Sequence, residues 1–198
     1  SLPRSLIYIG TTGVYGDCAG AKCDETRPIA PRTDRARRRA AAEARLRRFG
    51  RHHCRVVLLR APGIYATDRL PLERVRQGLP LLRAEDDAYT NHIHAEDLAR
   101  SLTAALRSGR SNRTYNVVDD TDLKMGDWFD RLADTFGLPR APRLAKDAAM
   151  AQLTPMQRSF MGESRRLDNR RLKQELGLRL DYPTIEEGIA AARRERVI

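Results

Sequence analysis

Short apolar runs alternate with helix-forming stretches along this chain. Residues 5–9, 56–59 and 114–118 read as buried strands, because apolar and β-branched side chains dominate them. Residues 33–49 have strong helix propensity, and residues 95–107 carry leucines on one helical face. Alternation of strand and helix favours a mostly parallel sheet with helices packed against it, so we predict an α/β protein.

The predicted helices carry recognisable ends. Thr33 is a suitable N-cap for the stretch that closes at Gly50, and Gly137 follows a helix predicted over residues 125–136. Shorter helices are predicted for four further segments, at residues 71–77, 146–152, 169–176 and 184–195. No internal repeat is visible, so we expect a single packed unit with a small appendage.

Basic residues dominate the charge. Lysine and arginine number 37 against 26 aspartate and glutamate residues, which gives a formal net charge of +11. Such a surplus attracts phosphate backbones. However, 33 of the basic residues are arginines, as a GC-rich genome would give, and aromatic residues make up only 6%. Because base-stacking platforms need aromatic side chains, the composition disfavours nucleic-acid binding.

The cysteines and the hydropathy of the sequence limit the cellular compartments that are expected for this protein. The three cysteines are odd in number and show no CxxC spacing, so we expect reduced thiols in the cytoplasm. No run of eighteen apolar residues is present, so we expect no membrane span. His92 and His94 lie close to Asp97 without a further ligand pattern, so we expect no metal site.

A glycine-rich segment at residues 10–16 spells GxxGxxG directly after a predicted strand. The same spacing occurs where a dinucleotide pyrophosphate binds, but that chemistry requires a helix to begin at once. Gly20, Pro28 and Pro31 instead favour a long loop. We therefore predict a turn that opens a loop, and not a phosphate loop.

Several short motifs follow one another in a recognisable order. Thr-Thr-Gly-Val-Tyr-Gly-Asp stands at 11–17, Leu-Arg-Ala-Pro-Gly-Ile-Tyr at 59–65, and Ile-His-Ala-Glu-Asp-Leu-Ala at 93–99. This order resembles that of extended short-chain dehydrogenases/reductases in the NAD-dependent epimerase/dehydratase family. The resemblance extends over nearly the whole chain, with Glu43 at the family's glutamate position.

The resemblance implies catalytic positions. In the family, a serine or threonine orients the substrate oxygen, while a YxxxK tyrosine and lysine exchange the proton and hold the nicotinamide ribose. Here Thr11 falls at the first position, Arg35 at the tyrosine and Arg39 at the lysine. Because guanidinium stays protonated, we expect the usual proton relay to be lost. Tyr15 is then an alternative acid in the same cleft, and Tyr65 is another.

The resemblance also implies a cofactor site and a substrate site. The expected cofactor is NAD or NADP, and the sequence does not choose between them. Its expected contacts are Arg39, Pro62, Gly63 and Ile64. The expected substrate contacts are Thr12, Tyr65 and Asn91. The family's phosphate loop has no match in this sequence, so we expect it upstream in the full-length protein.

We therefore predict the C-terminal part of a Rossmann-like doubly wound parallel sheet over residues 1–137. Residues 138–198 are predicted to form a small helical cap on the substrate side. Three functions remain open: an atypical NAD(P)-dependent oxidoreductase or epimerase, a non-catalytic NAD(P)-binding sensor or scaffold, and a basic interaction module. The expected partners are a small-molecule substrate and a second copy in a homodimer.

Overall fold

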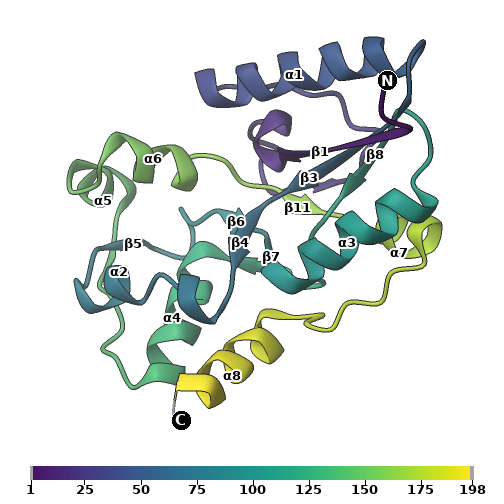
Figure 1. Cartoon of the computed structure of the whole chain (residues 1–198). Coiled ribbons are helices and arrows are strands. Elements are labelled where there is room, and N and C mark those ends of the chain that lie inside the picture. Colours follow the sequence, from purple (N-terminus) through teal and green to yellow (C-terminus); the bar gives the residue numbers. More distant parts are fainter. Residues whose placement is uncertain (1, 197–198) are drawn as a thin grey trace.

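A three-stranded parallel sheet lies at the centre of the molecule, in the order β1-β3-β8 (Figure 1). The computed structural model describes residues 2–196, apart from the side chains of residues 156, 159, 160 and 196. The sheet comprises β1 (Ser5–Thr11), β3 (Arg55–Ala61) and β8 (Arg113–Asn116). Because all three strands run in parallel, their carboxyl ends meet at one edge of the sheet.

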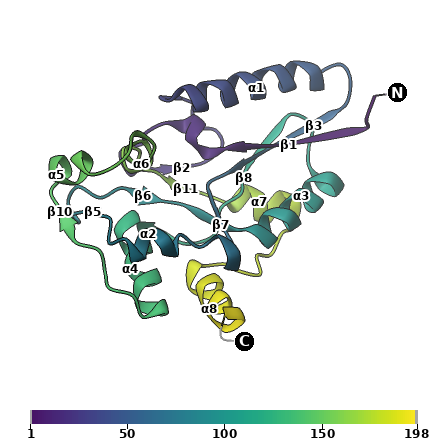
Figure 2. The ribbon, with the colours of Figure 1, turned by 60° about the vertical axis from the view of Figure 1, so that its left-hand side comes forward.

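Helices cover both faces of this sheet. Helix α1 (Asp34–Gly50) packs on one face, and α3 (Ala95–Ser108) and α7 (Arg170–Leu176) lie on the other (Figures 1 and 2). The core beneath α3 and α7 joins Val57 and Leu59 of the central strand to apolar side chains of both helices. The predicted α/β class and doubly wound Rossmann-like sheet are confirmed.

Helix α1 begins and ends where the sequence predicts. The Thr33 side chain accepts a hydrogen bond from the Ala36 amide at 3.1 Å, which satisfies one of the free N–H groups of the first turn. The helix ends at Gly50, where a Cβ would lie 2.8 Å from the Val56 side chain. Only Ala36 and Glu43 are buried along its 17 residues, so its other side chains are at least partly exposed.

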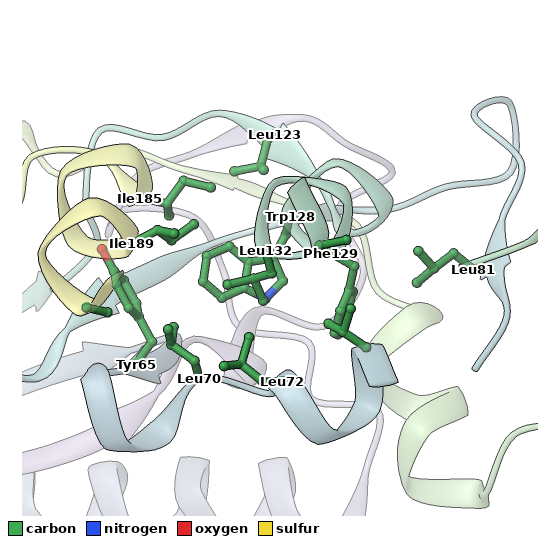
Figure 3. Packing of buried hydrophobic residues seen from close by; sticks show 13 residues of the cluster. Tyr65, Leu70, Leu72, Leu81, Leu123, Trp128, Phe129, Leu132, Ile185 and Ile189 are labelled. Atoms are coloured by element: carbon green, nitrogen blue, oxygen red, sulfur yellow. The ribbon is translucent and has the colours of Figure 1, made fainter. Parts of the chain in front are cut away.

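A second cluster of buried residues lies beyond the carboxyl edge of the sheet (Figure 3). Most of its residues come from β4 (Gly63–Tyr65), α2 (Leu72–Arg76), α4 (Met125–Phe136) and α8 (Ile185–Arg196). Figure 3 shows Trp128 and Leu132 between the Tyr65 ring and Phe129. Gly137 ends α4 in the left-handed conformation, as predicted. The tail thus packs in both clusters, through α7 in the first and α8 in the second, and the division at residue 137 stays a prediction.

The short strands were not predicted, because two or three residues carry no periodic signal. The helix predicted over residues 146–152 is present as α5 (Lys146–Ala151). The remaining elements are β2 (Lys22–Cys23), β5 (Leu81–Leu82), β6 (Tyr89–Thr90), β7 (His92–His94), β9 (Leu123–Lys124), β10 (Arg143–Leu144), β11 (Arg166–Leu167), α6 (Pro155–Met161) and two 3₁₀ turns, η1 (Thr12–Tyr15) and η2 (Thr67–Arg69). Their partners lie far away in sequence, as in the parallel pairing of β11 with β2. None of the helices within residues 2–196 is long and apolar enough to cross a membrane.

An ion pair buried between α1 and the sheet joins Glu43 to Arg60. The Arg60 guanidinium donates to both carboxylate oxygens, at 3.0 and 2.7 Å, and neither side chain is more than 5% exposed. Burial of either charge without the other would cost several kcal/mol. The pair therefore fixes how α1 sits on β3.

Replacing Arg60 with Met should lower the free energy of unfolding by about 3–5 kcal/mol, because Glu43 would remain buried without its partner. Urea denaturation measures this change. Arg37→Met is the control, because its ion pair with Asp34 is exposed and its loss should change stability little. Combining Arg60→Met with Glu43→Leu should recover most of the loss. A single variant as stable as the wild type would contradict this account of the pair.

Candidate functional site

A cavity of about 230 Å³ opens at the carboxyl ends of β1 and β3. Thr11 is the last residue of β1, and Pro62 follows the last residue of β3. Open α/β sheets bind ligands in the crevice outside this edge of their strands. The residues that line the cavity are Thr11, Thr12, Gly13, Thr33, Arg35, Ala36, Pro62, Gly63, Tyr89, Thr90, Asn91, His92, Met125, Glu163 and Arg165.

The glycine-rich turn places two threonines on this cavity. The Thr11 hydroxyl accepts a hydrogen bond from the Gly13 amide at 3.1 Å and caps η1. Gly16 ends η1 with φ 67° and ψ −156°, a conformation that is essentially restricted to glycine. Within residues 2–33 no α-helix begins, so the predicted loop is present and this turn lacks the helix start that a phosphate loop requires.

Tyr15 lies beneath the turn and does not line the cavity. Its hydroxyl donates to Asn116 Oδ1 at 2.8 Å, and the Arg60 guanidinium lies 4.6 Å from its ring centre. Desolvation by burial raises the pKa of the Tyr15 phenol, despite the nearby Arg60 charge. In this position Tyr15 anchors the turn to β3 and β8.

The two arginines at the family's catalytic positions are separated in the structure. Arg35 lines the cavity from the first turn of α1, close to its N-cap Thr33. Arg39 stands four residues further along, a rise of about 6 Å. Its guanidinium donates instead to the Tyr8 hydroxyl at 3.5 Å, and Arg39 is not a cavity residue. Of Thr11, Arg35 and Arg39, therefore, only the first two line the cavity.

Among the expected contacts in the segment after β3, some line the cavity and others do not. Pro62 and Gly63 line the cavity, and a Cβ on Gly63 would lie 3.1 Å from the His92 ring. Successive strand residues point to opposite faces. Ile64 accordingly faces away from the cavity, with 39% of its surface exposed. Tyr65 is buried against Trp128, and desolvation raises the pKa of its phenol strongly.

Asn91 lines the cavity, but hydrogen bonds to the tail occupy its amide. Its Nδ2 donates to the Arg165 carbonyl at 2.9 Å, and its Oδ1 accepts from the Leu167 amide at 2.9 Å. Thr12 also lies on the cavity, so two of the three predicted substrate contacts do. Asn91 is thereby placed to hold residues 165–167 in position beside the cavity.

The tail contributes two cavity residues that the sequence did not predict. Glu163 and Arg165 line the cavity, and the Arg165 guanidinium donates to Glu163 Oε2 at 2.8 Å. Arg165 also donates to the Gly16 carbonyl. These residues follow α6 in an irregular segment about 150 positions from β1, and no local pattern marks them as part of a site.

The two histidines of β7 have structural environments. Burial lowers the pKa of His92 to about 3, so its imidazole is neutral at pH 7. The His94 Nδ1 accepts from the Glu96 amide at 3.3 Å and caps α3. Among the residues described, no cluster of His, Cys, Asp and Glu could hold a metal ion.

Comparison with known proteins gives a consistent family signal. The profile of the NAD dependent epimerase/dehydratase family matches residues 2–118. No curated protein matches the chain. Among solved structures, a functionally unknown conserved protein from Silicibacter pomeroyi DSS is 35% identical, with a TM-score of 0.88 over 98% of this chain and 67% of that one.

Two enzymes share the fold at lower identity. A dTDP-glucose 4,6-dehydratase from Streptomyces venezuelae, solved with NAD bound, is 20% identical, with a TM-score of 0.76 over 96% of this chain and 59% of that one. A UDP-glucose 4-epimerase from Thermotoga maritima, solved with UDP-glucose, is 19% identical, with a TM-score of 0.78 over 98% of this chain and 65% of that one. The chain thus spans less than two thirds of the length of either enzyme.

Substituting Gly16 with Ala should destabilise the turn that carries Thr11 and Thr12. A Cβ there would lie 2.2 Å from the Ala30 carbonyl oxygen, in addition to the unfavourable φ. We expect a loss of about 3 kcal/mol, because strain and steric overlap act together. Gly137→Ala is the matched control. Its φ is also positive, but nothing lies within 4 Å, so about 1–2 kcal/mol is expected. Equal losses in urea denaturation would contradict the close packing at Gly16.

Proposed function

Because the chain belongs to the NAD dependent epimerase/dehydratase family, we propose that it is an NAD(P)-dependent oxidoreductase or epimerase-like protein acting on a small molecule. The observation that carries this proposal is the cavity at the carboxyl ends of β1 and β3. It gathers Thr11, Arg35 and the Pro62–Gly63 turn from three separate segments. Ligand sites of open α/β sheets lie at this edge.

The cavity suits the reacting end of a nicotinamide cofactor. Its volume of about 230 Å³ is below the roughly 300–1,000 Å³ of complete ligand pockets, so it fits part of a dinucleotide. The hydroxyls of Thr11, Thr12 and Thr33 can bind ribose hydroxyls or a carboxamide, and Arg35 offers donors to phosphate or carbonyl oxygens. Pro62 and Gly63 supply an uncharged wall. When bound, NAD or NADP would accept or supply a hydride there.

At the family's tyrosine and lysine positions this chain carries arginine, so we infer that the usual proton relay is lost. Arg35 stands at the tyrosine position and cannot exchange a proton, because guanidinium remains charged at any working pH. It can instead stabilise negative charge that develops on a substrate oxygen. Tyr15 and Tyr65, the alternative acids considered from the sequence, lie outside the cavity lining. The reaction therefore needs a different proton-exchanging group.

A non-catalytic NAD(P)-binding sensor or scaffold is the second candidate. The arginines at both relay positions favour it, since a sensor needs to bind the cofactor without turnover. A homodimer and a cytoplasmic location belong to either proposal, and gel filtration and cell fractionation test them.

The test combines binding and turnover. We expect the full-length wild-type protein, which includes the expected upstream phosphate loop, to bind NADH or NADPH in a fluorescence titration. It should also change nicotinamide absorbance with a member of a panel of sugar nucleotides, hydroxysteroids and small alcohols. Arg35→Ala should weaken binding or kcat/KM by about 10- to 100-fold, the value of one or two charge-assisted hydrogen bonds. Arg38→Ala, an exposed residue of the same helix that does not line the cavity, should change neither.

The outcomes separate the candidates. Binding without turnover of any panel member would favour the sensor or scaffold. If neither nucleotide binds, the nicotinamide proposal fails in both forms.

A further inference from the structure

Few side chains of the cavity can exchange a proton. Its ionisable lining residues are Arg35, Tyr89, His92, Glu163 and Arg165. The arginines stay protonated, and the low pKa of His92 makes its imidazole a poor base. Tyr89 and Glu163 therefore remain.

The Glu163 carboxylate has one oxygen that is engaged and one that is not. Oε2 accepts two N–H groups of Arg165, each at 2.8 Å. Oε1 is buried and has no hydrogen-bond partner within the part of the chain that the structure describes. A buried carboxylate oxygen without a donor is costly, and such groups in native proteins generally serve a ligand or bind water. The Glu163 side chain borders the cavity, so a ligand hydroxyl would supply the missing donor once a rotation of the carboxylate exposes Oε1.

The backbone around Glu163 is held firmly although it is irregular. The Ser164 amide donates to Asp17 Oδ1 at 3.0 Å, and the Ser164 carbonyl accepts from the amides of Cys18 and Gly20 at 2.9 and 3.0 Å. Its hydroxyl accepts from the Tyr89 amide at 3.0 Å. Four hydrogen bonds thus fix the residue between the two charged side chains, as is expected of a preorganised site.

Tyr89 has a more confined environment. Its ring packs against Gly20, where a Cβ would lie 3.2 Å from ring atom Cδ2. The Arg166 guanidinium lies 4.8 Å from the ring centre and the Lys124 ammonium 5.9 Å from it. These contacts give the ring a packing role, whereas Glu163 Oε1 has no such role.

We propose that Glu163 Oε1 exchanges the proton of a substrate hydroxyl, in place of the missing tyrosine–lysine relay. This inference rests on the proposed function. In the oxidative direction, a bound NAD(P)⁺ would take the hydride of the alcohol carbon as the C=O bond forms. The hydroxyl proton passes to Glu163 Oε1. Arg165 holds Oε2 throughout, and the reverse reaction returns the proton to the carbonyl oxygen.

The test is Glu163→Ala, assayed with the panel member that the wild type turns over. We expect kcat to fall by about 10²- to 10⁴-fold, the usual contribution of general acid–base catalysis. Sodium formate should restore part of the activity, because a small carboxylate can occupy the vacated space. The melting temperature should fall moderately, because Arg165, only 14% exposed, loses its carboxylate partner, so activity is assayed well below that temperature.

Glu175→Ala is the matched control. Glu175 also pairs with an arginine, Arg113, and its side chain is 16% exposed, against 11% for Glu163. It lies outside the cavity lining. We expect this variant to keep its turnover and to show no response to formate.

Three results would overturn the inference while the proposed function stands. These are full turnover by Glu163→Ala, a loss that formate does not relieve, and a loss confined to Tyr89→Phe. If the wild type turns over no panel member, the oxidoreductase proposal itself fails. The binding of the same compounds is then measured by the shift that each causes in the melting temperature. A hydroxyl compound that raises the melting temperature of wild type but not of Glu163→Ala would support Oε1 as the ligand acceptor. Equal shifts, or none, would overturn it.

Discussion

A buried carboxylate–guanidinium pair ties the helix on one face of the sheet to its central strand. Glu43 can be buried only where Arg60 meets it, so α1 has one acceptable position along β3. The same guanidinium covers the Tyr15 ring, whose hydroxyl reaches Asn116 on β8. This series of contacts extends to Glu25, because the backbone amide of Asn116 donates to one of its carboxylate oxygens. These contacts therefore position α1, the glycine-rich turn and the strands relative to one another. They also fix the carboxyl end of β1 and the first turn of α1, which meet at the cavity.

The sequence was informative wherever the structure is local. The Ala- and Arg-rich run with Thr33 at its start and the stretch before Gly137 both became the helices that were predicted. Strand–helix alternation was sufficient for the parallel sheet, because few other arrangements bury such a pattern. The helical repeat of 3.6 residues per turn did not show that Arg39 would donate to Tyr8 and lie outside the cavity that Arg35 lines. That orientation depends on where α1 rests on the sheet, which only its tertiary partners decide.

The wall formed by the tail could not be predicted at all. Glu163 and Arg165 stand in a charged, irregular stretch whose pattern resembles any solvated loop. Their placement depends on hydrogen bonds to Asp17, Gly16 and Asn91, which come from other parts of the sequence. Family resemblance did not help, because it directed attention to the two positions where arginine replaces tyrosine and lysine. The ionisable groups of the cavity instead come from four different segments.

The hydrogen bonds around Ser164 have a consequence for how the molecule assembles. Ser164 and Asp17 are separated by 147 residues, so the entropy of closing a long loop opposes their meeting. Contacts of such sequence separation tend to form late, after the more local strand and helix pairs are in place. A nascent chain synthesised only as far as residue 162 already contains every strand of the central sheet and both threonines of the turn. It still lacks one side of the cavity, so the binding site is completed only after residues 163–165 have been synthesised.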